Sequence, residues 1–229
     1  FYVFFEAMLI PVYFLIGLYG GGRRQYAAMK FLLFSLAGGL IMLVSVVAVS
    51  LKKQGGDPSV LFQHIDGNPA GPQRVRAPMW PVHTWLPDAA TESRPAPAVR
   101  LVGVLDKVGT YGMIRFCLQL FPEASQWATP VVITLAVISV IYGALLAIGQ
   151  KDMMRLIAFT SISHFGFIVL GIFAMTSVGG AGSTLYMVNH GFSTAGLFLI
   201  AGFLVTRHGS KMIPDYGGWQ RVTPVLAGS

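Results

Sequence analysis

Long apolar runs, separated by short polar turns, make up most of this chain and predict a protein built from membrane-spanning helices. A transmembrane helix needs about 20 consecutive and mostly apolar residues. The runs that approach or exceed this length cover residues 1–19, 26–51, 98–120, 128–149, 155–175 and 183–206. We therefore expect an all-α fold, a polytopic transmembrane helix bundle that forms a single membrane domain over residues 1–229.

The turns between the apolar runs predict which side of the membrane each helix end faces. Lys and Arg collect in cytoplasmic loops, so the basic turns at 23–24, 151–155 and 207–211 are expected on the cytoplasmic side. The turns at 121–127 and 176–182 contain no Lys or Arg and are expected on the outer side. The last four predicted spans alternate consistently with this assignment.

Residues 52–97 form an irregular, proline-rich segment without a run of spanning length. The alternation of loop charges nevertheless requires a membrane crossing within this segment, so one crossing is missing. Within it, PMWPVHTWLPDAATE at 78–92 places three prolines in ten residues, which prevents a continuous helix. Non-helical backbone at membrane depth is tolerated only inside protein or beside a water-filled cavity. We therefore expect a broken helix at 78–92.

The composition excludes a soluble domain and most cofactor chemistry. Only 11% of the residues are charged, against about 25% in soluble domains. The net charge of +7 resides mainly in short loops, so it indicates membrane topology rather than nucleic-acid binding. Cys117 is the only cysteine, which excludes a disulfide framework and iron–sulfur ligation. His83, Asp88 and Glu92 fit no usual metal-ligand spacing, so no metal site is expected.

Four ionisable side chains are expected at membrane depth, where an ionised group costs at least about 2.5–3.5 kcal/mol. At about 1.5 Å per residue, Lys107 lies about 22 Å, His164 about 20 Å and His190 about 14 Å from the outer turns. Glu6 lies about 21 Å from the first inner turn. An acid, an amine and two imidazoles at a similar depth are what a proton relay requires, because histidine titrates near neutrality.

Each of these residues also has a purely structural interpretation. Glu6 would then be hydrogen-bonded inside the bundle, and His164 and His190 would be packing histidines with satisfied partners. Lys107 would pair with Asp106, but adjacent residues point about 100° apart on a helix, which disfavours a direct pair.

Lys30 is a weaker candidate for the relay. It lies one turn inside its apolar run, so its amine is expected to reach the headgroup region instead. Gly143 and Gly191 are expected to permit close packing of helices rather than to carry chemistry.

Five motifs follow one another along nearly the whole chain: FFEAMLIPVYFLIG, PMWPVHTWLPDAATE, GVLDKVGTYGMIRF, DMMRLIAFTSISHFGFIVLGI and NHGFSTAGLFLIAG. Together they closely resemble the antiporter-like chain M family of bacterial NADH–quinone oxidoreductase, also called respiratory complex I. The resemblance implies a multi-pass, proton-translocating subunit of the bacterial plasma membrane, packed in the lipid bilayer against other membrane-arm subunits. It also implies that NADH, FMN, iron–sulfur clusters and quinone are bound by other subunits, with no cofactor here. Because the chain starts at Phe1 inside an apolar run, we expect an internal fragment of a longer protein.

The resemblance also implies roles for individual residues. Glu6 matches the glutamate of the family's fifth helix, and Lys107 matches the central lysine of the eighth. His164 and His190 match the histidines of the tenth and eleventh helices. In the family the lysines store and pass protons, while the glutamate tunes the lysine of a broken seventh helix. Arg76 stands at the position of that seventh-helix lysine, and arginine stays protonated in proteins.

Two other functions stay open on the residues alone. Subunits of multisubunit Na+/H+ antiporters and membrane-bound hydrogenases share the lysine and glutamate signature. The second alternative is that the chain is a non-pumping structural remnant. Its basis is that IDGNPAGPQRV and Arg76 replace the family's apolar run and its lysine.

The remnant hypothesis predicts that pumping requires both an apolar span before Ala77 and the substitution Arg76→Lys. The measurement is the quenching of a pH-sensitive dye in proteoliposomes that contain the reconstituted complex. On this hypothesis the unrepaired chain pumps no protons and the repaired chain does. Pumping by the unrepaired chain would refute it.

Overall fold

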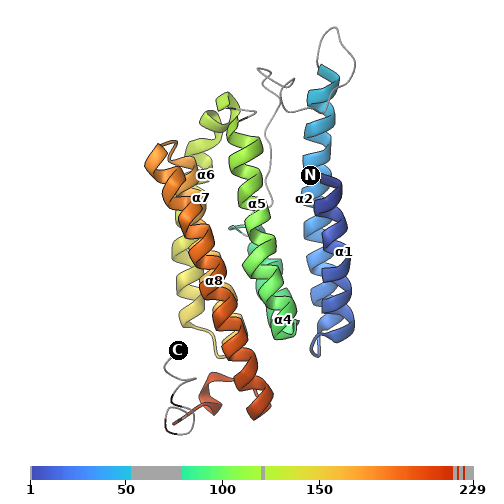
Figure 1. Ribbon diagram of the computed structural model, residues 1–229, viewed down its shortest axis with the longest axis vertical. Helices are drawn as coiled ribbons and strands as arrows, with labels where there is room; N and C mark the ends of the chain where they lie inside the picture. The colour runs from blue at the N-terminus through green and yellow to red at the C-terminus, as the bar shows by residue number, and fades with distance from the viewer. Residues whose placement is uncertain (1, 53–78, 120–121, 219–220, 222–223, 225–229) are drawn as a thin grey trace.

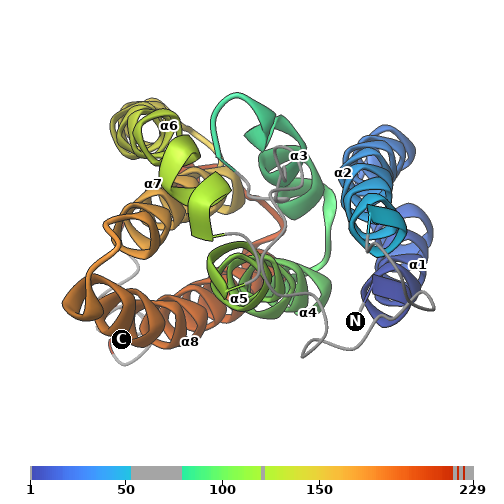
Figure 2. The same cartoon turned by 90° about the horizontal axis from the view of Figure 1, so that it is seen from above.

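A computed structural model describes residues 2–52, 79–119, 122–218, 221 and 224 as a bundle of roughly parallel helices (Figure 1). In chain order the elements are α1 (Tyr2–Tyr19), α2 (Arg24–Lys52), η2 (Val82–Thr84), α3 (Trp85–Glu92), α4 (Pro95–Ala98), η3 (Val99–Leu105), α5 (Asp106–Gly112), η4 (Met113–Leu118), α6 (Pro122–Ile148), α7 (Met153–Phe173), α8 (Ser177–His208) and η5 (Ile213–Asp215). Seen from above, α3 lies beside α2, and α7 lies between α6 and α8 (Figure 2).

The long helices coincide with the predicted apolar runs, but several begin earlier than hydropathy alone indicates. The helix α8 begins at Ser177 because the hydroxyl of Thr176 accepts a hydrogen bond from the amide of Gly179 at 3.0 Å. The helix α7 begins where Asp152 accepts the amide of Arg155 in the same way, at 3.0 Å. Hydropathy identifies the apolar part of a helix, whereas polar capping residues decide where the helix starts.

The predicted span 98–120 is a continuous helical rod from Pro95 to Leu118, but it is not a regular α-helix. Two parts of it, η3 and η4, are π-helical and flank the α-helical turns of α5. Hydropathy does not distinguish these winding types, so the sequence predicted a plain helix here. Such π-helical turns are rare and are frequently found at functional sites. Lys107 lies in α5, between the two.

The proline-rich stretch forms the expected broken helix in its described part. Residues 82–92 and 95–98 form the short elements η2, α3 and α4, and the extended residues Ser93 and Arg94 separate α3 from α4. Pro87 fits the first turn of α3, and Pro95 begins α4, because the first amides of a helix have no intrahelical partner.

The basic turns lie together at one end of the bundle, as the loop charges predicted (Figure 1). The amide of Gly21 donates to the carbonyl of Glu92 at 2.7 Å, and the amide of Met153 donates to the carbonyl of Lys211 at 2.9 Å. The helix α2 ends at the opposite end from the start of α4. The predicted missing crossing lies within residues 52–97, of which residues 53–78, including Arg76, are outside the described residues.

The helix α7 forms the centre of the described bundle. Three helices of the described part, α6, α7 and α8, are long and apolar enough to cross a membrane. In the most apolar 18-residue stretch of each helix, the buried share of residues is 67% in α7, 22% in α6 and 28% in α8. The helices α6 and α8 therefore present most of their surface outward, whereas α7 carries residues that face protein.

Close approach of α6 and α7 depends on glycine, as expected for Gly143. A Cβ atom at Gly143 would lie 2.8 Å from the amide nitrogen of Ser163, and one at Gly166 would lie 2.8 Å from the carbonyl oxygen of Ala136. Gly191 likewise permits close packing, since its Cβ would lie 3.2 Å from the carbonyl oxygen of Gly103.

The substitution Gly143→Ala is expected to destabilise the folded protein by about 1–3 kcal/mol, because the added methyl group meets the α7 backbone. The loss is measured as a lower thermal midpoint of the purified protein in detergent. Gly196→Ala is the matched control, since its Cβ would meet no other described atom within 4 Å outside its own helix backbone. Equal midpoints for the two variants would contradict this packing.

Candidate functional site

Lys107, His164 and His190 come together near the middle of the bundle, as the sequence predicted for a relay. They lie on α5, α7 and α8. The two imidazole rings are 5.4 Å apart between centroids, and the charge of Lys107 acts electrostatically on both rings. Three helices distant in sequence therefore contribute one titratable group each to a single cluster.

The ammonium group of Lys107 is hydrogen-bonded to a backbone carbonyl of the same helical segment. Its Nζ atom donates to the carbonyl oxygen of Val102 at 2.6 Å, a residue of η3 five positions earlier. Asp106 is buried, and no ion pair joins it to Lys107 among the described residues. The expectation that these neighbours do not pair directly agrees with this geometry. The π-helical stretch thus supplies an oxygen acceptor for the ammonium group, in addition to the charge of the buried Asp106 beside it.

The two histidines have hydrogen-bond partners that the sequence analysis did not name. His164 Nδ1 lies 2.6 Å from the hydroxyl of Tyr186, and His190 Nε2 lies 3.2 Å from the hydroxyl of Ser161. His190 is buried, whereas His164 is exposed on the described bundle. Spacing offered a signal, because Tyr186 precedes His190 by four residues and Ser161 precedes His164 by three, which places each pair on one helix face.

These contacts form two hydrogen-bonded pairs, Tyr186 with His164 and Ser161 with His190, whose imidazole rings lie 5.4 Å apart between centroids. Each imidazole nitrogen and each hydroxyl can either donate or accept a hydrogen bond, depending on the tautomer. Lys107 acts on this group through its charge, and its amine is hydrogen-bonded to Val102 instead. The arrangement is therefore suited to moving a proton between helices.

The structure does not place every predicted relay residue in this cluster. Glu6 is half-buried on α1, a helix that packs against α2 and α4. None of the hydrogen bonds or ring contacts described for the cluster involves Glu6. Arg76 lies outside the described residues.

Lys30 pairs with a carboxylate of another helix, a contact that its position near a helix end does not predict. Its Nζ atom lies 2.6 Å from Oδ2 of Asp88 on α3, and its side chain is 19% exposed. Pairing between helices, which helix position alone does not reveal, explains the difference.

Asp88 and Glu92 bind basic groups in this structure. Asp88 pairs with Lys30, and the backbone amide of Arg23 donates to Glu92 Oε2 at 3.1 Å. No group of three or more His, Cys, Asp or Glu side chains able to hold a metal occurs in the described part of the chain.

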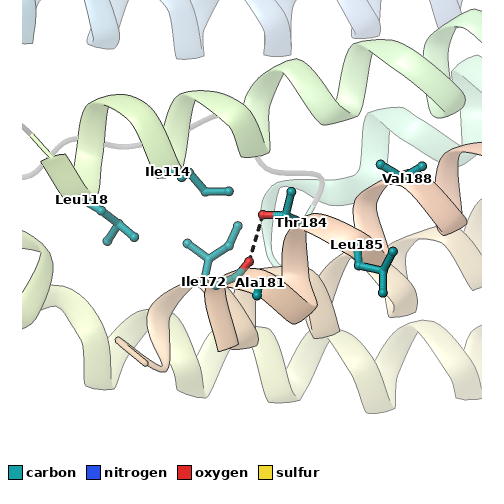
Figure 3. Close-up of a pocket in the computed structure, with 8 residues that line it drawn as sticks. Ile114, Leu118, Ile172, Ala181, Thr184, Leu185 and Val188 are labelled. Carbon is teal, nitrogen blue, oxygen red and sulfur yellow. Dashed lines mark hydrogen bonds between the residues drawn. The ribbon is translucent and has the colours of Figure 1, made fainter. Parts of the chain in front are cut away.

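An open pocket lies apart from the polar cluster, between η4, α7 and α8 (Figure 3). It has a volume of about 560 Å³ and is lined mostly by apolar side chains, including Ile114, Leu118 and Ile172. The hydroxyl of Thr184 at its edge donates to the carbonyl of Gly180 in its own helix at 2.9 Å. The pocket therefore offers apolar contact but no polar group for a small molecule.

The chain matches the family model described as NADH:quinone oxidoreductase/Mrp antiporter, TM, over residues 1–68 and 73–229. It is 56% identical over 251 residues to NADH-quinone oxidoreductase subunit M of Mycobacterium tuberculosis (strain ATCC 25618 / H37Rv), covering 100% of this chain and 45% of the relative. Subunit M of Rickettsia prowazekii (strain Madrid E) is 40% identical over 238 residues, covering 99% and 48% respectively. The chain spans about half the length of the curated relatives it matches.

Solved structures share the same fold. Respiratory complex I from Thermus thermophilus with bound NADH contains a chain that matches with a TM-score of 0.89 at 35% identity, covering 100% of this chain and 51% of that chain. The archaeal membrane-bound sulfane sulfur reductase matches with a TM-score of 0.81 at 24% identity, covering 99% and 49%. The Mrp complex from Dietzia sp. DQ12-45-1b matches at 0.83 and 22%, covering 99% and 45%. The last two likenesses concern the fold alone.

The comparison also bears on the segment between α2 and α3. The family match is interrupted at residues 69–72. The alignment with the Mycobacterium tuberculosis relative is 251 residues long, whereas this chain has 229 residues, so the chain carries gaps relative to that protein.

Replacing Tyr186 by phenylalanine removes only the hydroxyl that bonds to His164. We expect the imidazole nitrogen chemical shifts of His164 to change and the stability to fall by about 0.5–1.5 kcal/mol, the usual worth of one hydrogen bond. Solid-state NMR of histidine-labelled protein measures the shifts. Tyr142→Phe is the control, because Tyr142 packs on the ring of His83 instead. Unchanged His164 signals in Tyr186→Phe would contradict the assigned contact.

Proposed function

The chain belongs to the NADH:quinone oxidoreductase/Mrp antiporter family of transmembrane proteins, and we propose from this premise that it carries part of a proton path. The protein of which it is a part translocates protons across a bacterial plasma membrane, as a subunit of the membrane arm of NADH–quinone oxidoreductase. Its partners are the neighbouring membrane-arm subunits and the lipid bilayer. NADH oxidation and quinone reduction take place in other subunits, and this chain supplies no cofactor.

The cluster around Lys107 is the observation that carries this proposal. The Lys107 amine donates to a carbonyl at 2.6 Å, lies beside the buried Asp106, and acts through its charge on two imidazoles from other helices. Ionisable residues inside membrane helices are costly and typically mark ion pathways. The 56% identity to a subunit M supports the same assignment for the protein as a whole.

In this mechanism Lys107 stores a proton and the histidines pass it between α7 and α8. An ammonium group has three N–H donors, of which one is bound to Val102. Since like charges repel, a proton on Lys107 and a proton on either imidazole disfavour each other. A proton that leaves Lys107 thus prepares the histidines to take one up, and Ser161 and Tyr186 hold the rings in place.

Glu6 is proposed to act from outside this cluster, through its helix α1. The Lys107, His164 and His190 groups move the proton, while Glu6 contributes a charge on the α1–α2 side of the bundle. Sodium transport is the competing function, because subunits of multisubunit Na+/H+ antiporters share the lysine and glutamate signature, and the family description includes the Mrp antiporter. Measuring ion pumping in membrane vesicles distinguishes proton transport from sodium transport.

The substitution Lys107→Ala is expected to lower NADH-driven proton pumping about 100-fold, the scale of losing one acid–base group. Pumping is measured by dye quenching in membrane vesicles that contain the assembled complex. NADH oxidation with an artificial electron acceptor is expected to stay unchanged, since no redox group lies in this chain. Lys151→Ala is the matched control, because Lys151 is exposed in the turn between α6 and α7.

Normal pumping by Lys107→Ala would overturn the proposed relay. Pumping that requires sodium ions, and that an added proton carrier enhances, would favour sodium transport instead. If the unmodified protein pumps neither ion while its complex assembles, it is a structural subunit only.

A further inference from the structure

The eight-residue helix α3 is held by basic groups from several other elements. Its two carboxylates, Asp88 and Glu92, are four residues apart and therefore lie on one face of the helix. Their basic partners come from α2, from the turn before α2 and from α7. So short a helix has few internal hydrogen bonds, and its position depends on contacts with its neighbours.

Asp88 shares its carboxylate between two cations on different helices. Its Oδ2 atom lies 2.6 Å from Nζ of Lys30 on α2, and its Oδ1 atom lies 3.7 Å from a guanidinium nitrogen of Arg155 on α7. The Asp88 side chain is 16% exposed, and the Nε atom of Arg155 is buried without a hydrogen-bond partner among the described residues. Removing the carboxylate would leave two half-buried cations facing each other.

The far end of α3 is tied by hydrogen bonds as well as charge. The backbone amides of Gly21 and Arg23 donate to Glu92, and the Nζ atom of Lys211 donates to the carbonyl of Thr91 at 2.6 Å. The end of α3 is therefore fixed to the basic turns. Asp88, one helical turn earlier, is the contact that reaches both α2 and α7.

The helix α3 is also a main link between two parts of the described bundle. The pair α1–α2 packs against α3 and, through α1, against α4 (Figure 2). On its other side α3 packs against α7, which carries His164. A movement of α1–α2 can thus be transmitted to the relay helices through α3, and the polar part of that link is Asp88 with its two partners.

We propose that Asp88 is a positioning residue of the pump, which couples α1–α2 to α7 by holding α3 between Lys30 and Arg155. This inference rests on the proposed function. Asp88 carries no transported proton in this role. It fixes the spacing between the α1–α2 pair, which bears Glu6, and the helices that bear the Lys107 relay.

The test is the number of protons pumped per NADH oxidised by the assembled complex in native membrane vesicles. Asp88→Asn keeps the shape of the side chain and removes its charge, so we expect the ratio to fall about fivefold or more, the scale of coupling between distant sites. Asp88→Glu restores the carboxylate and is expected to recover most of the ratio. Glu123→Gln, at an exposed position in the first turn of α6, is the matched control.

The pairing itself is tested by Lys30→Gln alone and combined with Asp88→Asn. If the two side chains act through each other, the double variant loses no more than Asp88→Asn alone. The amount of assembled complex is measured by native gel electrophoresis in every variant. Should Asp88→Asn fail to assemble, Lys30→Gln, which leaves the Asp88 and Arg155 contact in place, is expected to lower the ratio by itself.

An unchanged ratio in Asp88→Asn, or in Lys30→Gln where the first does not assemble, would overturn the inference. A loss of complex with a normal ratio in what remains would also overturn it, since Asp88 would then serve stability only. The proposed function fails separately, if Lys107→Ala pumps normally. If Lys107→Ala does not pump protons while Asp88→Asn keeps a normal ratio of protons per NADH, the proposed function holds and only the inference about Asp88 is wrong.

Discussion

The cost of an ionised group in hydrocarbon governs the arrangement of charge in this protein. At the centre of a transmembrane helix that cost is at least about 2.5–3.5 kcal/mol, so each such group needs a partner. Lys107 donates a hydrogen bond to the Val102 carbonyl of the same helical segment, and Lys30 pairs with the Asp88 carboxylate on a second helix. The first solution leaves the amine beside two imidazoles, which suits proton transfer. The second neutralises the charge and joins two helices, which suits mechanical coupling.

Both solutions depend on departures from regular helix. The π-helical stretch η3 precedes Lys107 and contains the carbonyl, five residues earlier, that accepts a hydrogen bond from its ammonium group. The break before α3 produces a short helix whose carboxylates reach α2 on one side and α7 on the other. Irregular backbone is tolerated in a membrane only where protein surrounds it, and both stretches border α7 or α8. Function and backbone irregularity therefore coincide in this bundle.

The helix α7 connects the two charge clusters. Arg155 near its start faces Asp88, and Ser161 and His164 further along belong to the relay. At about 1.5 Å per residue, Arg155 and His164 are about 13 Å apart along the axis. Because α7 is the most buried of the three long apolar helices, a shift at one end is resisted by packing and transmitted to the other.

The sequence by itself determined the apolar spans and the grouping of the basic turns at one end of the bundle, and it predicts a similar depth for Lys107, His164 and His190. Each of these follows from local composition and from the fixed rise of a helix. The resemblance of five motifs added the family. Only the tertiary structure decided that Lys30 pairs with Asp88, that Tyr186 and Ser161 hold the histidines, and that the Lys107 rod contains π-helical turns. These are contacts between distant segments or small changes in winding. Hydropathy carries no information about either, because it reports how apolar a stretch is and not which neighbour it meets.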